Sequence, residues 1–118
     1  LERLGEHGVG SRLDPGTWLP APSQAAIGVE CRGGDARAAG WLAAIDHPRS
    51  RAEITAERAL LAALGGSCHS AVACLSRWEG LQISLTAALF SPRGHERVIG
   101  QVRVDPSDPA GAAILARD

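Results

Sequence analysis

One cysteine, Cys68, lies in a short polar loop between two regular segments. The loop, residues 64–73, reads Leu-Gly-Gly-Ser-Cys-His-Ser-Ala-Val-Ala, with a helical pattern before it and alternating apolar residues after it. Reactive groups often lie on loops that rigid elements hold, because the atom is then both fixed and accessible. A thiol at this place could act as a nucleophile or as a covalent attachment point.

The neighbours of Cys68 leave its role open. Free cysteines are among the most buried residues, so Cys68 could pack at the start of a strand. His69 and the exposed amides of a glycine loop could instead favour the thiolate, with His69 as a base. These residues alone do not separate packing, nucleophilic attack and attachment.

The remaining cysteines predict no metal site. Cys68 and Cys74 are not closely paired, whereas structural zinc sites use close pairs of ligands. Cys74 is expected in the core, and Cys31 likewise. Three cysteines at no framework spacing are typical of free thiols in a reducing compartment, so a cytoplasmic protein is expected.

Three arginines, Arg3, Arg12 and Arg32, flank a glycine-containing first segment. Guanidinium groups bind carboxylates through two parallel hydrogen bonds, so these residues could bind a polycarboxylate, although surface solvation also explains each of them. The glycine pairs 33–34 and 65–66 lack the strand, lysine and helix of a phosphate-binding loop.

Composition predicts one globular domain, or one domain with part of a second. Of 118 residues, 45% are hydrophobic and 21% charged, which suffices for a core. A net charge of −1 and only 3% aromatic residues argue against nucleic-acid binding. No apolar stretch is long enough to predict a membrane span. Because methionine is absent, Leu1 is not expected to be a natural start, and we expect a fragment or processed product.

Residues 17–31 predict a strand. Two prolines keep the backbone extended, and apolar residues then alternate with small ones up to Cys31. Its partner strands would lie in a sheet that this sequence does not contain. The next residues, 32–34, predict a hinge.

Two helices are predicted next. The first is capped by Asp35 and ends before Pro48. The second is predicted to begin with a capping box of Ser50 and Glu53. It should stop at Gly65, where a left-handed residue is needed.

After Cys68 the hydrophobic period drops to two, which predicts three antiparallel strands joined by turns. Pro109 suits the first position of a closing helix. Trp41 and Trp78 are expected to pack in the core or at its rim. The predicted strands cover residues 70–78, 81–89 and 95–104. We therefore predict an α+β fold, a three-stranded antiparallel sheet with helices on one face, preceded by the remnant strand of another sheet.

Three stretches occur in an order and spacing typical of one enzyme family. They read LPAPSQAAIGVECR over residues 19–32, AERA over 56–59 and GGSCHSAVA over 65–73. The triplet that begins at Arg3 fits the segment upstream. Together they resemble the C-terminal part of porphobilinogen deaminase, also called hydroxymethylbilane synthase, over nearly the whole chain.

The resemblance implies three domains, of which the third, an α+β domain, carries a dipyrromethane cofactor on a loop cysteine through a thioether bond. On that cofactor the family condenses four porphobilinogen molecules with loss of ammonia, in tetrapyrrole (heme) biosynthesis. Cys68 falls on the cofactor cysteine. Arg3 falls on an arginine that binds the acetate and propionate groups of cofactor or substrate. Gln24 occupies the glutamine of the segment that returns the chain from the second domain to the first.

On this resemblance, residues 1–34 are the remnant of the preceding α/β domains and residues 35–118 the C-terminal cofactor-carrying domain. The fragment alone is expected to be inactive and to hold no catalytic residue, because the family's cleft and its aspartate lie in other domains. The parent is expected to be a monomer that acts on porphobilinogen and the growing pyrrole chain, and to bind neither nucleic acid nor membrane. The alternatives are a thiol-dependent enzyme using Cys68 and His69, and a non-catalytic interaction domain.

The chain departs from the family pattern at two places. The usual Gly-Gly-Cys-Gln-Val-Pro-Ile-Gly reads GSCHSAVA over residues 66–73, and the usual Gly-Gln-Gly reads Ser-Gln-Ala over residues 23–25. Ser67 and Ala71 can adopt most turn conformations, so we expect these changes to affect the shape of the loop more than the chemistry of the thiol.

Overall fold

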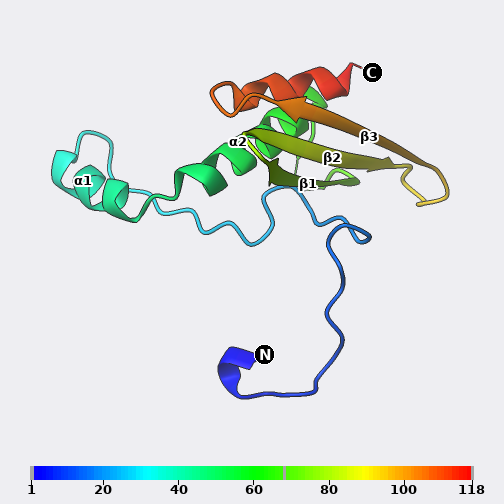
Figure 1. Ribbon diagram of the computed structural model, residues 1–118, viewed down its shortest axis with the longest axis horizontal. Helices are drawn as coiled ribbons and strands as arrows, with labels where there is room; N and C mark the ends of the chain where they lie inside the picture. The colour runs from blue at the N-terminus through cyan, green and yellow to red at the C-terminus, as the bar shows by residue number, and fades with distance from the viewer. Residues whose placement is uncertain (1, 68, 118) are drawn as a thin grey trace.

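A computed structural model describes residues 2–67 and 69–117 of the chain. Its strands form one antiparallel sheet in the order β1-β2-β3, and α2 and the 3-10 helix η2 lie on one face of it (Figure 1). The predicted α+β class and three-stranded antiparallel sheet are confirmed. In chain order the elements are η1 Glu2–Leu4, α1 Ala36–Ile45, α2 Pro48–Ala63, β1 Val72–Glu79, β2 Gln82–Phe90, β3 Arg97–Val104 and η2 Pro109–Ala116.

The core lies between the two packed helices and one face of the sheet. Successive strand residues point to opposite faces, so every second residue of each strand meets the helices. The core includes the predicted Cys74 and, from β2, Ile83, Leu85 and Ala87, whereas Leu81, in the hairpin turn, is 88% exposed and Leu89 is 41% exposed. The buried residues that form this core cluster are Ala56, Leu60, Cys74, Ile83, Leu85, Ala87, Val104 and Ala112.

The start of α2 differs from the prediction. The capping box of Ser50 and Glu53 is wrong, because the helix begins at Pro48 and is capped by His47. The His47 ring Nδ1 accepts from the Ser50 N–H at 3.3 Å. Proline suits the first helical position since its φ is already helical and its missing N–H would have had no partner. The end of the helix is as predicted, with Gly65 at φ +63°.

The predicted strand over residues 17–31 is wrong. In the described part of the chain this segment has turns and extended backbone, and no strand pairs with it. A lone strand leaves its backbone groups without partners and is not stable by itself. Ile27 is 91% exposed and Cys31 is exposed, so the expected core position of Cys31 is also wrong.

Helix α1 stands apart from the sheet (Figure 1). Its cap is as predicted, with the Asp35 carboxylate accepting from the Ala38 N–H at 2.9 Å, but none of its residues is buried. Trp41 is 61% exposed under the Arg37 guanidinium, so its predicted packing is wrong. Trp78 does pack against the core.

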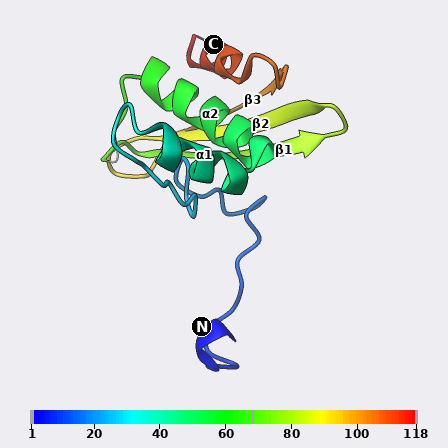
Figure 2. The same cartoon turned by 90° about the vertical axis from the view of Figure 1, so that its left-hand side faces the viewer.

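The N-terminal residues also lie away from the sheet, as Figures 1 and 2 both show. The division into residues 1–34 and 35–118 stays a prediction. Among the helices that the structure describes, none is both long and apolar enough to cross a membrane.

Leu60 provides a test of the core, since its side chain is 1% exposed. We expect Leu60→Ala to lower the free energy of unfolding by about 2–5 kcal/mol, because it removes buried methyl groups and leaves a cavity. Leu81→Ala, at an exposed position, should change it by less than about 0.5 kcal/mol. Urea denaturation measures both, and equal effects would contradict the described packing.

Candidate functional site

The loop that contains Cys68 joins the end of α2 to the start of β1. Cys68 itself lies outside the described residues, whereas the residues on both sides of it are described. Ser67 and His69 are both exposed. The chain next to the thiol-bearing position is therefore open to solvent on either side.

Two serines close this loop. The Ser70 hydroxyl accepts from the Ser67 N–H at 2.8 Å, and the Ser70 N–H donates to the Ser67 carbonyl at 3.0 Å. The Ser67 hydroxyl in turn accepts from the His69 N–H at 3.3 Å. These bonds bracket position 68, so its two flanks are held in a defined turn.

Gly66 packs the loop against α2. Its N–H donates to the Leu61 carbonyl at 2.8 Å. A Cβ at this position would lie 2.5 Å from Leu61 Cδ1, 3.1 Å from the Leu61 carbonyl oxygen and 3.2 Å from Ser70 Oγ. A side chain at this position would therefore require the Leu61 side chain to shift, and the Leu61 carbonyl and the Ser70 hydroxyl leave little further room.

Residues 20–26, here called the strap, lie along the outer edge of β1. The Pro20 carbonyl accepts from the Cys74 N–H at 2.9 Å. Within the strap, Gln24 Oε1 accepts from the Ala21 N–H at 3.0 Å. The amide of Gln24 therefore stabilises the local turn.

The strap holds two residues in a costly backbone conformation. Ser23 and Ala25 have φ of +61° and +66°, in the left-handed region. For a residue with a side chain this costs about 1–2 kcal/mol. These are the positions of the two glycines in the family pattern, so the contacts of the strap must offset the strain.

Glu57 forms the contact that holds the strap to α2. Its side chain is only 6% exposed. Oε2 accepts from the Ser23 N–H at 2.6 Å, and Oε1 accepts from the Ser76 N–H at 2.8 Å. A hydrogen bond to a charged group contributes about 1.5–3 kcal/mol, so the bond from Ser23 offsets much of the strain in the strap. One carboxylate thereby joins α2, β1 and the strap.

Glu53 extends this arrangement by one helical turn. Its carboxylate lies close to the Trp78 backbone on β1. Four helical residues rise about 6 Å and two strand residues about 6.7 Å, so glutamates four apart on α2 lie opposite alternate residues of β1. Burial raises the pKa of Glu53, and the Glu57 carboxylate raises it further. Glu57 and Pro20 accept from the outward N–H groups of Ser76 and Cys74 on β1.

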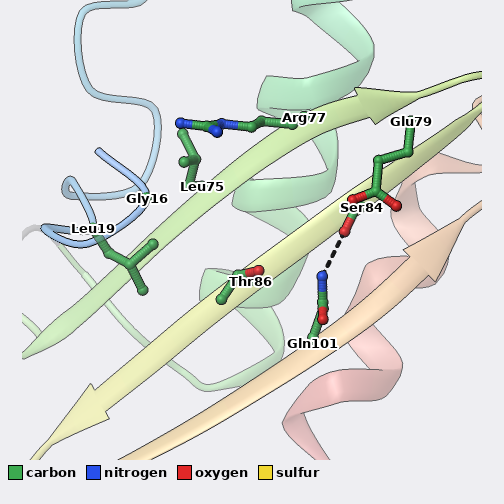
Figure 3. Close-up of a pocket in the computed structure, with 8 residues that line it drawn as sticks. All are labelled: Gly16, Leu19, Leu75, Arg77, Glu79, Ser84, Thr86 and Gln101. Atoms are coloured by element: carbon green, nitrogen blue, oxygen red, sulfur yellow. Dashed lines mark hydrogen bonds between the residues drawn. The ribbon is translucent and has the colours of Figure 1, made fainter. Parts of the chain in front are cut away.

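Two shallow clefts flank β1, and neither includes a described residue of the loop. One, of about 250 Å³, lies under the strap and includes Glu53 and Glu57. Figure 3 shows the other, of about 170 Å³, on the sheet face opposite α2, where Arg77 reaches toward the turn at Gly16. Ligand sites usually measure about 300–1,000 Å³, so neither cleft is large enough to serve as an enclosed small-molecule site. The cleft in Figure 3 is lined by Gly16, Leu19, Leu75, Arg77, Glu79, Ser84, Thr86 and Gln101.

The structure does not bring the other predicted site residue to the loop. Arg3 lies in η1, which is separated from the sheet and the loop in both views (Figures 1 and 2). Among the described residues, no three His, Cys, Asp or Glu side chains are grouped to hold a metal ion.

Sequence reasoning missed Glu57 as a structural centre. The signal was its place in the apolar stripe of α2, directly after Ala56 and three residues before Leu60, both of which are buried. A carboxylate at such a place needs hydrogen-bond donors, which periodicity cannot identify.

The cysteines that the structure describes should differ in reactivity. Burial raises the pKa of Cys74 to about 12, with the negative charge of Glu57 adding to the effect. At pH 8 only about one Cys74 thiol in 10,000 is then ionised, and the thiolate is the reactive form. Cys31 is exposed. We expect iodoacetamide at pH 8 to label Cys31 and leave Cys74 unmodified in the folded chain. Peptide mass spectrometry measures both, and rapid labelling of Cys74 would contradict its buried position.

Substitution of Gly66 should distort the loop. We expect Gly66→Ala to lower the free energy of unfolding by about 1–3 kcal/mol, because the new methyl group overpacks the contact with Leu61. Gly33→Ala is the matched control, since nothing lies within 4 Å of its added Cβ. Denaturation of both variants tests the contact, and a Gly66→Ala variant as stable as the control would refute it.

Comparison with known proteins shows that this chain is similar to porphobilinogen deaminases. A family profile described as "Porphobilinogen deaminase, C-terminal domain" matches residues 51–117. The porphobilinogen deaminase of Sphingopyxis alaskensis is 48% identical over 105 residues, which cover 88% of this chain and 33% of that protein. That of Xanthomonas oryzae is 56% identical over 81 residues, covering 68% of this chain and 27% of that protein. The chain thus spans about a quarter to a third of the length of these curated relatives.

Proposed function

The chain belongs to the porphobilinogen deaminase family, as its C-terminal domain, and from this we propose that it is the cofactor-bearing part of a hydroxymethylbilane synthase. In this proposal the parent enzyme is a cytoplasmic, monomeric transferase of tetrapyrrole biosynthesis. It condenses four porphobilinogen molecules, each losing its amine as ammonia, and releases the tetrapyrrole by hydrolysis. Cys68 would bind a dipyrromethane cofactor through a thioether bond.

The main support for this proposal is the structure of the loop between α2 and β1. Residues on both sides of position 68 are exposed, so the described chain offers no obstacle to a group attached there. The hydrogen bonds between Ser67 and Ser70 hold the loop although the family's glycine is replaced by Ser67. Among the described residues, only Ser23 and Ala25 carry a side chain at positive φ, so Ser67 introduces no such strain.

The residues of this chain suit the attachment and support of the dipyrromethane cofactor. When bound, the dipyrromethane would supply the pyrrole end to which porphobilinogen is added. Cys68 would fix it through a bond that survives repeated cycles, and Arg3 is proposed to bind carboxylate groups of the cofactor or the substrate in the assembled enzyme. The helix and strand on either side keep the loop in place. We propose that the 118 residues alone are inactive, since the remaining parts of the family's site lie in other domains.

Intact mass of the full-length parent enzyme tests the attachment. We expect the wild type to carry a dipyrrole-sized increment and Cys68→Ser to lack it, because only a thiol at position 68 forms the thioether. Cys31→Ser is the control, since it removes an exposed cysteine outside the loop and should keep the increment. Equal masses of wild type and Cys68→Ser, after correction for the substitution, would reject the proposal.

A further inference from the structure

We propose that Glu57 is a positioning residue, which couples the strap to the loop that bears Cys68 and so sets where that loop lies during the reaction. The inference rests on the proposed function. It starts from the observation that one buried carboxylate joins three segments that are distant in sequence.

Both elements that support the loop are bound to Glu57. The residue itself is on α2, six residues before Ala63, the last residue of the helix. Its Oε1 accepts from Ser76 on β1, the strand that follows the loop. Because the two flanks of the loop share one anchor, α2, β1 and the loop move as one body.

The strap depends on the same anchor. Oε2 of Glu57 accepts from the Ser23 N–H. Ser23 is itself one of the two strained residues of the turn, and Ala25 is the other. In the described structure the Ser23 and Ser76 hydroxyls are buried without a hydrogen-bond partner, so these side chains do not reinforce the attachment. Loss of the carboxylate would therefore free the turn around Ser23, and only the hydrogen bond from Cys74 to the Pro20 carbonyl would still join the start of the strap to β1.

The functional consequence is that the loop bearing Cys68 is aligned with the rest of the enzyme. A displacement of about 1 Å between reacting groups can lower a rate about 100-fold. If the strap sets the loop relative to the rest of the enzyme, loss of Glu57 should lower the rate of reaction more than it lowers substrate binding. Cofactor attachment should persist, because the Ser67 and Ser70 hydrogen bonds hold the loop locally.

Glu57→Gln in the full-length enzyme tests this role. The amide keeps the volume of the side chain, but its NH₂ must face one of the two backbone N–H groups. Glu53→Gln is the matched control, since Glu53 is one turn away on α2 and forms no hydrogen bond with the strap in the described structure. Ala25→Val weakens the strap from its own side, because a β-branched residue is strained at φ +66°, and it leaves the core untouched.

Hydrogen exchange and kinetics supply separate readouts. We expect Glu57→Gln and Ala25→Val to raise amide exchange in the peptide that covers residues 20–26 about tenfold or more. Both should keep the dipyrrole increment in intact mass. For cofactor-loaded enzyme, kcat should fall about 10- to 100-fold, with KM for porphobilinogen within about threefold of the wild type. Glu53→Gln should change neither exchange in the strap nor kcat by more than about threefold.

Three results would overturn the inference. The first is faster exchange in the strap with normal kcat, and the second is an equal loss of kcat in Glu53→Gln. The third is unchanged exchange in the strap of Glu57→Gln. If Glu57→Gln does not fold, Ala25→Val decides by the same criteria. A wild-type enzyme without a dipyrrole increment would instead reject the proposed function, while the exchange data would still report whether Glu57 holds the strap.

Discussion

The structure depends on how the outer edge of β1 is closed. An uncovered edge strand presents a row of unpaired backbone groups and invites pairing with another chain. Here the Pro20 carbonyl and the Glu57 carboxylate accept from the Cys74 and Ser76 amides, so a turn and a helix cover this edge in place of a fourth strand. The pitch of the helix and the rise of the strand nearly match, so Glu53, one turn before Glu57, lies close to Trp78 further along the strand.

This edge also explains why the loop can carry function. The loop lies between α2 and β1, and the Glu57 carboxylate binds β1 directly from α2. The loop can therefore present Cys68 from rigid supports while keeping its own short hydrogen bonds. The family's glycines are replaced at residues 23, 25 and 67, and hydrogen bonds hold the chain at Ser23 and at Ser67.

Local patterns predicted the elements whose partners are close in sequence. The hairpins, the Asp35 cap and the end of α2 at Gly65 depend on nearby residues, so periodicity and turn chemistry were enough. The strand predicted over residues 17–31 failed because strand formation needs a distant partner. His47 was missed as a cap because Pro48 fixed an earlier start. Glu57 was missed because its two donors are 34 and 19 residues away, where no sequence pattern points.

One carboxylate, that of Glu57, holds the strap to the domain that contains the loop. A crystal structure of the full-length parent enzyme tests it most directly. It should show both Ser23 N and Ser76 N within hydrogen-bonding distance of the Glu57 carboxylate, with Ser23 and Ala25 at positive φ. A strap that has left β1, with Glu57 turned to other partners, would contradict the account.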